Sequence, residues 1–193
     1  MREFFTSDTH FLHNKEFIYA DRGFSSIEEM DEALIENWNS VVTPEDTVYH
    51  LGDLFLGTDL EAGGEILRRL NGHIHLITGN HDTERKLAYI KENIPNIESI
   101  QRSEWIKRHK RMIVLSHYPV ITTQAVDISQ STSKSTLCFF GHTHQKTNFM
   151  NGLRFDYHVG VDSHNLTPVD LETALNDIKE HWNKLYRQSM NED

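Results

Sequence analysis

Residues 76–82 read Leu76-Ile77-Thr78-Gly79-Asn80-His81-Asp82, a short, largely apolar run that stops at a glycine and is followed at once by three polar side chains. Upstream, residues 73–78 alternate between polar and apolar side chains, which is typical of a β-strand. Downstream, a helix is expected from about Thr83 to Asn93, before Pro95. A strand and a helix in this order form the repeating unit of α/β folds.

The same junction recurs on both sides of this segment. Short strands are expected at residues 4–7, 46–51, 112–116 and 137–140, and polar residues stand at the end of each. The five junctions are Asp8-Thr9-His10, Gly52-Asp53, Gly79-Asn80-His81-Asp82, Ser116-His117 and Gly141-His142-Thr143-His144. Each is weak evidence alone, but side chains at the carboxyl ends of strands converge in α/β proteins. Five junctions at equivalent positions therefore predict one shared polar site, which glycines would let the backbone approach closely.

The remaining elements complete an α/β pattern with mixed sheets. A helix is expected over residues 27–41, after the capping-box pair Ser26 and Glu29, and another from about Asp59 to Leu70. Strands are expected at residues 97–107 and 153–161, and a last amphipathic helix begins near Asp170. No repeat or linker is visible, so we expect a single domain over residues 1–193.

The composition restricts the classes of function. The 193 residues are 37% hydrophobic and carry 19 basic and 29 acidic side chains, a formal charge of −10 that repels polyanions. Nucleic acid is therefore an unlikely partner. The single cysteine, Cys138, lies in an apolar run and is expected in the core. No apolar stretch is long enough to span a bilayer and no secretory signal is visible, so we expect a cytoplasmic protein with no membrane partner.

As a set, the five junctions resemble in content and order the signature of calcineurin-like metallophosphoesterases. The segments Tyr49-His50-Leu51-Gly52-Asp53 and Gly79-Asn80-His81-Asp82 look especially similar to small bacterial and phage members. The resemblance implies a four-layer αββα sandwich with two mixed β-sheets. It also implies a dinuclear metal centre in a cleft formed by loops at the strand ends.

The resemblance further implies a role for each polar residue. Asp8, His10 and His144 would bind the first metal, Asn80, His117 and His142 would bind the second, and Asp53 would bridge both. Carboxylate, amide and imidazole ligands suit two divalent ions such as Mn²⁺, our first choice, or Fe, Zn, Ni or Co.

These charges predict a phosphoesterase mechanism. Two divalent ions and the carboxylates of Asp8 and Asp53 leave a formal +2, which attracts a small phosphorylated substrate. We expect hydrolysis of a phosphate mono- or diester by in-line attack of a metal-bridging hydroxide. The resemblance implies that His81 faces the phosphate, which Asn80 would also contact, and His81 would protonate the leaving oxygen or stabilise the charge that develops on it. Asp82 is expected either to orient the His81 ring or to cap the helix that follows Thr83.

Two further residues are candidates for substrate contacts at the rim of the cleft. His13 follows the first junction closely, and Arg22 could bind a phosphate oxygen through its forked guanidinium. A solvated loop histidine and an ordinary surface arginine are the alternatives. The Ser- and Thr-rich segment from Pro119 to Thr136 joins two junctions and is a candidate substrate-shaping loop.

Two other functions stay open at this point. A non-catalytic protein-interaction module could keep the same fold. A nuclease could use the basic stretch from Arg102 to Arg111 as an auxiliary grip, although a solvated turn between strands is the favoured interpretation of that stretch. The sequence does not indicate an oligomeric state.

Overall fold

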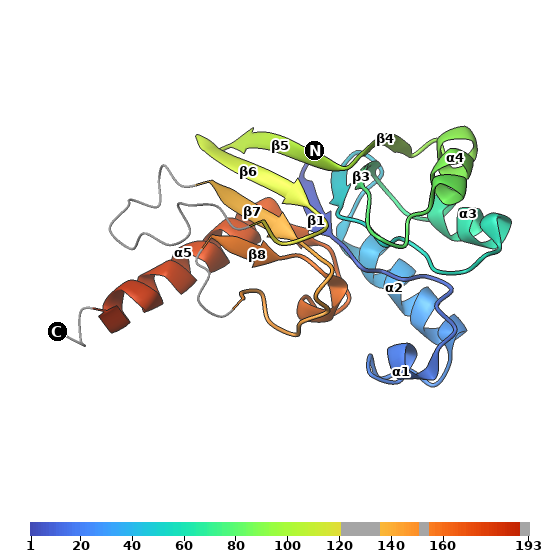
Figure 1. Ribbon diagram of the computed structural model, residues 1–193, viewed down its shortest axis with the longest axis horizontal. Coiled ribbons are helices and arrows are strands. Elements are labelled where there is room, and N and C mark those ends of the chain that lie inside the picture. Colours follow the sequence, from blue (N-terminus) through green and yellow to red (C-terminus); the bar gives the residue numbers. More distant parts are fainter. Residues whose placement is uncertain (121–135, 151–154, 190–193) are drawn as a thin grey trace.

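The computed structural model describes residues 1–120, 136–150 and 155–189, and the chain folds around two β-sheets (Figure 1). The first sheet has the order β4-β3-β2-β1-β9. Its strands are β1 (Glu3–Thr6), β2 (Thr47–His50), β3 (His73–Ile77), β4 (Ile97–Gln101) and β9 (Val169–Asp170). The first four are parallel, and β9 is antiparallel to β1. The predicted parallel core of an α/β fold is thus present in this sheet.

The second sheet has the order β5-β6-β7-β8. It contains β5 (Ser103–Arg108), β6 (Arg111–Ser116), β7 (Leu137–Phe140) and β8 (Asp156–His158). The β5–β6 pair is an antiparallel hairpin, whereas β6, β7 and β8 run parallel. Both sheets are therefore mixed, as the sequence predicts.

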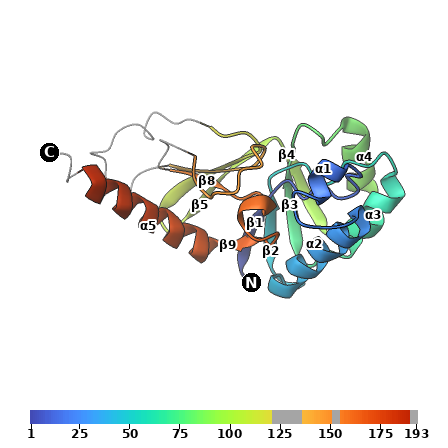
Figure 2. The same cartoon turned by 90° about the horizontal axis from the view of Figure 1, so that it is seen from below.

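Helices cover the first sheet and contribute to the core between the sheets. They are α1 (Glu16–Tyr19), α2 (Ile27–Val41), α3 (Leu60–Arg68), α4 (Glu84–Asn93) and α5 (Leu171–Ser189), with a short 3-10 turn, η3 (Val161–Ser163). Figure 2 shows α2, α3 and α4 gathered on one side of the first sheet and α5 at the opposite end of the molecule. None of the helices in the described part of the chain is long and apolar enough to cross a membrane.

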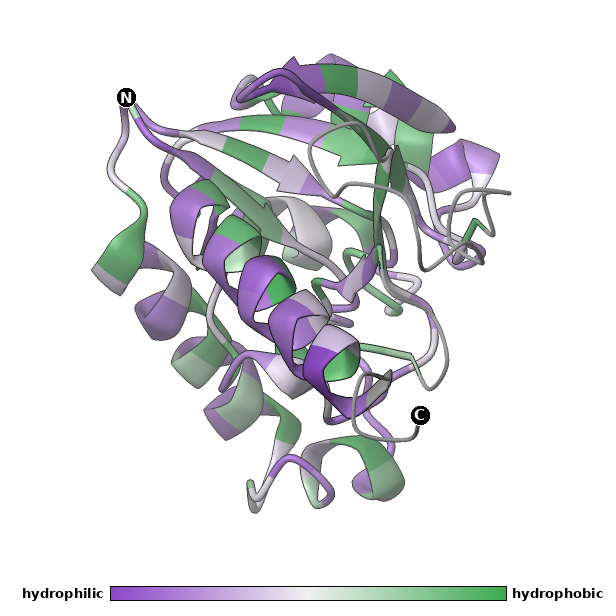
Figure 3. Cartoon of the chain, turned by 90° about the vertical axis from the view of Figure 1, so that its left-hand side faces the viewer, coloured by the Kyte–Doolittle hydropathy of each residue, from purple (hydrophilic) through white to green (hydrophobic). Residues whose placement is uncertain are grey.

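The two faces of the first sheet bury two different cores. Successive strand residues point to opposite faces, so Phe4 packs with Trp38 of α2 while Phe5 packs with Phe139 of the second sheet. The apolar residues of α5, including Ile178, join this second core. Figure 3 shows hydrophobic residues at intervals along a largely hydrophilic α5, the pattern of an amphipathic helix. The α/β fold with two mixed sheets is confirmed.

The structure corrects the predicted strand over residues 97–107. This segment forms β4 in the first sheet and β5 in the second, with Arg102 between them. No glycine or proline marks the change, so the sequence pattern appears continuous. The predicted strand at residues 153–161 is also shorter, because β8 covers only residues 156–158 and η3 begins at Val161; residues 151–154 lie outside the described part.

Candidate metal centre

The loops that follow β1 and β2 run side by side and fix the first two junctions. The backbone N–H of Asp8 donates to the Gly52 carbonyl at 3.0 Å, and that of His10 donates to the Asp53 carbonyl at 3.1 Å. A Cβ atom on Gly79 would collide with the Asp53 carboxylate, so the third junction also requires its glycine. These contacts bring three separate segments to one place.

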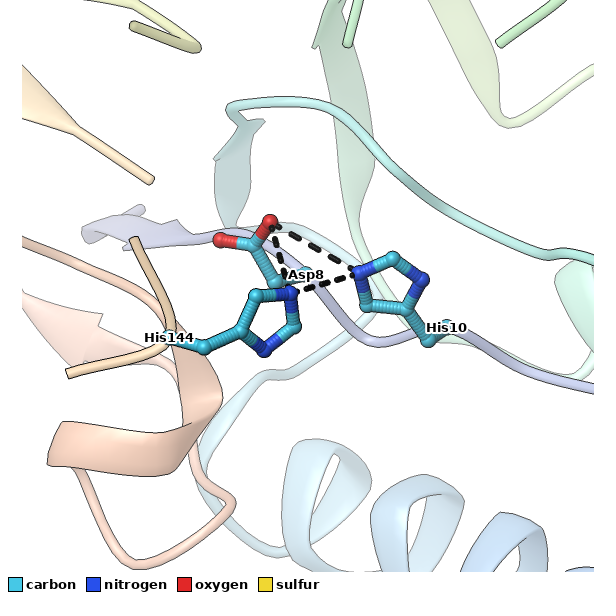
Figure 4. Close-up of side chains that lie close together, drawn as sticks. All are labelled: Asp8, His10 and His144. Atoms are coloured by element: carbon cyan, nitrogen blue, oxygen red, sulfur yellow. Dashed lines mark hydrogen bonds and ion pairs between the residues drawn. The ribbon is translucent and has the colours of Figure 1, made fainter. Parts of the chain in front are cut away.

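The first group of candidate ligands consists of Asp8, His10 and His144. The Nε2 atoms of His10 and His144 lie 3.0 Å apart, and they lie 3.8 and 3.9 Å, respectively, from Oδ1 of Asp8. Figure 4 shows the three side chains pointing toward one another. Asp8 and His10 are buried, whereas His144 is about one-third exposed, with 37% of its side chain accessible. The group can hold one metal ion.

The second group consists of Asn80, His117 and His142. Oδ1 of Asn80 lies 2.9 Å from Nε2 of His117 and 2.9 Å from Nδ1 of His142. The two imidazole nitrogens are 3.2 Å apart. One amide oxygen and two ring nitrogens thus converge on one point.

Asp53 lies between the two groups. Its Oδ2 is 3.7 Å from Nε2 of His10 in the first group and 3.5 Å from Nε2 of His117 in the second. Its Oδ1 accepts a hydrogen bond of 2.8 Å from the backbone N–H of His81. The carboxylate is nearly fully buried and is placed to face both groups at once. The structure therefore brings all seven predicted ligands together.

The two imidazoles of the first group differ in their electrostatics, because the hydrogen bond with Asp162 raises the pKa of His144 whereas burial acts in the opposite direction on His10. Burial lowers the pKa of His10 to about 2, so its ring is uncharged and Nε2 can offer a lone pair. Burial also raises the pKa of the Asp8 carboxyl, against the hydrogen bond that the Ser7 hydroxyl donates at 2.6 Å. Buried carboxylates and imidazoles without a cation are costly, whereas a divalent ion would stabilise both in their metal-binding forms. The donor set, which contains no thiolate, fits Mn, Fe, Co, Ni or Zn.

Asp162 and Arg22 form a buried support for the first group. Oδ2 of Asp162 lies 2.8 Å from Nδ1 of His144. The Arg22 guanidinium pairs with Asp162 at 2.8 Å and donates to the backbone carbonyls of Asp8 and Thr9 at 2.7 and 2.9 Å. Although burial opposes it, hydrogen bonds from His144 and Arg22 hold the pKa of Asp162 well below its usual range. Asp162 is thus a carboxylate that orients a candidate ligand.

This support corrects the prediction for Arg22 and adds a residue that the sequence did not reveal. Only 4% of the Arg22 side chain is exposed, and its donors are used within the protein, so it is neither a phosphate clamp nor a surface arginine. Asp162 stands in η3, outside the five junctions and with no motif around it. Only its position in space connects it to His144.

The other predicted residues occupy different places around the cluster. The His81 ring is 45% exposed, and its Nε2 lies 3.9 Å from Oδ2 of Asp53. The ring of His13 is half-buried beside that of His10, with centroids 5.6 Å apart. Tyr118, which is 49% exposed and follows the fourth junction, contacts the rings of His117 and His142. Most of the predicted substrate-shaping loop, residues 121–135, lies outside the described residues.

Asp82 does not have either of its predicted roles. Its carboxylate accepts hydrogen bonds from the backbone N–H groups of Gly79, Asp53 and Leu54, at 2.8, 2.8 and 3.2 Å. Those bonds use both oxygens, and in the described part of the chain none reaches the His81 ring. Thr83, not Asp82, precedes α4 as its N-cap, and its side chain makes no capping bond. Asp82 instead fastens the loop after β2 to the loop after β3.

Two more buried side chains hold these loops. The Lys86 ammonium donates to the carbonyls of Phe55 and His81 at 2.6 and 3.1 Å. His50 accepts a hydrogen bond from the N–H of Gly52 through Nδ1, and its Nε2 lies 3.1 Å from the Thr9 hydroxyl. Because that hydroxyl donates to the Leu54 carbonyl, the His50 proton is assigned to Nε2. Neither residue carries a sequence signal beyond its place near a junction.

Fold and cluster together define a two-sheet α/β protein with an Asp/His metal site. The calcineurin-like phosphoesterase superfamily domain matches residues 1–159. The chain therefore belongs to the calcineurin-like phosphoesterase superfamily, a metal-dependent family, as its five junctions predict.

Relatives of similar length match nearly the whole chain. The uncharacterized protein MJ1445 of Methanocaldococcus jannaschii is 34% identical over 175 residues, covering 88% of this chain and 86% of that protein. The gene 66 protein of a Mycobacterium phage is 28% identical over 200 residues, covering 91% and 96%. The crystal structure of a protein of unknown function from Aquifex aeolicus has the same fold, with a TM-score of 0.66, 23% identity and coverage of 92% and 98%.

Proposed function

We propose that this protein is a dinuclear metal-dependent hydrolase of small phosphate mono- or diesters. The observation that carries this proposal is the position of Asp53, whose Oδ2 faces His10 on one side and His117 on the other. A single carboxylate oxygen between two sets of nitrogen and oxygen donors is an arrangement that suits two adjacent divalent ions. Superfamily membership supports phosphate ester hydrolysis as the reaction class.

The two ligand groups assign the metals. Asp8, His10 and His144 would hold one ion, Asn80, His117 and His142 would hold the other, and Asp53 would contact both. When bound, the ions would lower the pKa of a water molecule and offset the charge on the phosphate oxygens. The protein then has to hold the ester in line with that water and supply a proton to the leaving oxygen.

His81 is the proposed proton donor. Its ring is the most accessible of the three imidazoles within 4 Å of the Asp53 carboxylate, and its backbone N–H donates to that carboxylate. The ring can therefore reach a substrate without acting as a ligand. Protonation of the leaving oxygen removes the charge that develops as the P–O bond breaks. Asn80, which adjoins His81, would contact the same phosphate.

The two alternative functions, a non-catalytic interaction module and a nuclease, receive less support. Loss of ligands would be expected in a protein that kept the fold only for interaction, yet all seven candidate ligands converge. For a nuclease, the basic stretch would need free cations. Arg108 is paired with Glu3 at 2.5 Å instead, which leaves less positive charge for a phosphate backbone.

The test separates metal binding from proton transfer. Bis(4-nitrophenyl) phosphate and 4-nitrophenyl phosphate are assayed after chelation and after addition of Mn²⁺, and bound metal is measured by mass spectrometry. Asp53→Asn should lose both metals and activity. His81→Ala should keep the metals and lose about 10²–10⁴-fold in kcat. The exposed pair of controls, Asp21→Asn and His73→Ala, should behave like the wild type.

Two results would reject the assignment. One is hydrolysis by Asp53→Asn at the wild-type rate. The other is loss of metal from His81→Ala as complete as that from Asp53→Asn, since His81 would then be a ligand. Inactivity of the metal-loaded wild type toward both esters would favour the interaction module.

A further inference from the structure

A pocket opens beside the candidate metal centre, on the His81 side. Its volume is about 300 Å³, and it is lined by two segments, one between β2 and α3 and one at the start of α4. The lining residues include Leu56, Leu60, Asn80, His81, Arg85 and Lys86. Asn80 and His81 also belong to the candidate site, whereas the other six predicted ligands do not line the pocket. The cavity is therefore continuous with the site on one side only.

The position of His81 indicates which part of a substrate would enter this pocket. In an in-line displacement the leaving group departs on the side opposite the attacking water. A residue that protonates the leaving oxygen must be within hydrogen-bond reach of it. Because His81 lines the pocket and its Nε2 also lies 3.9 Å from Oδ2 of Asp53, a leaving group that His81 protonates extends into the pocket.

The walls of the pocket are apolar and cationic. Leu56 and Leu60 supply apolar surface, and Arg85 and Lys86 supply two positive charges, while none of the described residues lines the cavity with a carboxylate. The Lys86 ammonium already donates hydrogen bonds to the carbonyls of Phe55 and His81. Arg85 is exposed, and within the described ranges it has neither an ion pair nor a side-chain hydrogen bond. The positive charge of the pocket lining is opposite in sign to the formal charge of −10 on the whole chain.

We propose that this pocket binds the leaving group of the substrate and that Arg85 binds an anionic substituent, a carboxylate or a second phosphate, on that leaving group. The inference rests on the proposed function, because it takes His81 as the proton donor. It deepens that function by giving the substrate class: esters in which the phosphate and a second negative charge are separated by an apolar portion. Arg85 is then a specificity-determining residue, since its guanidinium can form paired, charge-assisted hydrogen bonds with either anion.

Binding of unreactive analogues tests the pocket without turnover. The probes are 4-carboxybenzylphosphonate, its uncharged carboxamide and the corresponding 1,4-xylylene diphosphonate, in which methylene carbon replaces the leaving oxygen. Calorimetry with the Mn²⁺-loaded protein should give a dissociation constant about tenfold lower for the charged probes than for the carboxamide. The carboxylate and diphosphonate arms distinguish the two kinds of anion.

Variants assign the preference to Arg85. Arg85→Gln should abolish the preference while leaving carboxamide binding unchanged, and Arg85→Lys should restore part of it. Arg187→Gln is the matched control and should keep the full preference, because Arg187 is an exposed residue of α5, the helix at the other end of the molecule (Figure 1).

The outcomes separate this inference from the proposed function. Three results would overturn the pocket assignment. The first is equal binding of the probes with and without a second negative charge, and the second is no binding of any probe. The third is an undiminished preference in Arg85→Gln. Nitrophenyl ester hydrolysis by the same preparation would then leave the proposed function standing. Preference for charged probes without hydrolysis of any ester would reject the proposed function, and with it the description of the occupant as a leaving group.

Discussion

At the scale of single residues, the candidate site is built on backbone conformations that its side chains disfavour. Asp8, His10, Asp53, His142 and His144 all have φ between 48° and 67°, in the left-handed region. Such residues cost about 1–3 kcal/mol each and persist where the surrounding structure holds them for a function. These five are half of the ten non-glycine residues with positive φ in the described part of the chain, so the strain is concentrated at the candidate ligands without being confined to them. Removal of a supporting contact should affect metal binding before it affects the fold.

The contact of Asp162 with His144 allows this dependence of metal binding on supporting contacts to be tested. Asp162→Asn removes the charge that faces Nδ1 of His144, so the affinity for the first metal should fall about 10–100-fold. A competition titration with a chromogenic chelator measures the affinity, and circular dichroism checks the fold. Asp177→Asn is the control, because Asp177 is also half-buried and hydrogen-bonded but lies on α5. Equal losses in the two variants would contradict a specific role for Asp162.

His50 gives a prediction for pH. Burial lowers its pKa to about 3, whereas an unfolded histidine titrates near about 6.5. Between these values the unfolded chain binds a proton that the folded chain excludes, so this residue makes stability fall as the pH drops from about 6.5 toward 3. The contribution is at most about 1.4 kcal/mol per pH unit.

Urea unfolding at pH 6.5, 5.5 and 4.5 measures this dependence. His50→Gln should be less stable than the wild type at pH 6.5, because the contacts with Gly52 and Thr9 are weakened. Its stability should then fall less steeply on acidification. Identical slopes for the two proteins would show that His50 does not carry the effect.

At the scale of elements, the strand ends were predictable and the supports between them were not. The junctions after β1, β2, β3, β6 and β7 follow from local patterns, because an apolar run and a following polar residue are neighbours in sequence. The roles of Arg22 and Asp82 depend on partners far along the chain or on loop backbone, which no local pattern encodes. The two-residue β9 and the four-residue α1 also escaped prediction, because elements this short contain too few residues to show a period.

Lys86 tests how α4 supports the loop of His81. Lys86→Met keeps the apolar stem but leaves the carbonyls of Phe55 and His81 without their buried donor, which should cost about 1–3 kcal/mol of stability. Because the His81 carbonyl is freed, kcat should also fall while bound metal stays the same. Lys91→Met on the exposed face of the same helix is the control and should change neither quantity. Unchanged urea stability of Lys86→Met would contradict this account.

At the scale of the whole molecule, the centre joins both sheets. Its candidate ligands follow strands of the first sheet and strands of the second, and the Ser7–Gly160 bridge connects the end of β1 with the segment after β8. Occupied metal sites would therefore cross-link the two halves of the fold. Metal binding should stabilise the molecule as a whole and not only its loops.

Thermal unfolding tests this coupling. Ions that bind the folded chain in preference to the unfolded one add about 2.7 kcal/mol when the free metal is about 100 times its dissociation constant. Mn²⁺ should therefore raise the unfolding temperature by several degrees, and a chelator should reverse the change. The shift should be lost in Asp53→Asn, because the shared carboxylate is gone, and should persist in His81→Ala, whose ring is not a ligand. If Mn²⁺ shifted the unfolding temperature of Asp53→Asn as much as that of the wild type, the stabilising ions would bind elsewhere, and the two sheets would be held together by their apolar core alone.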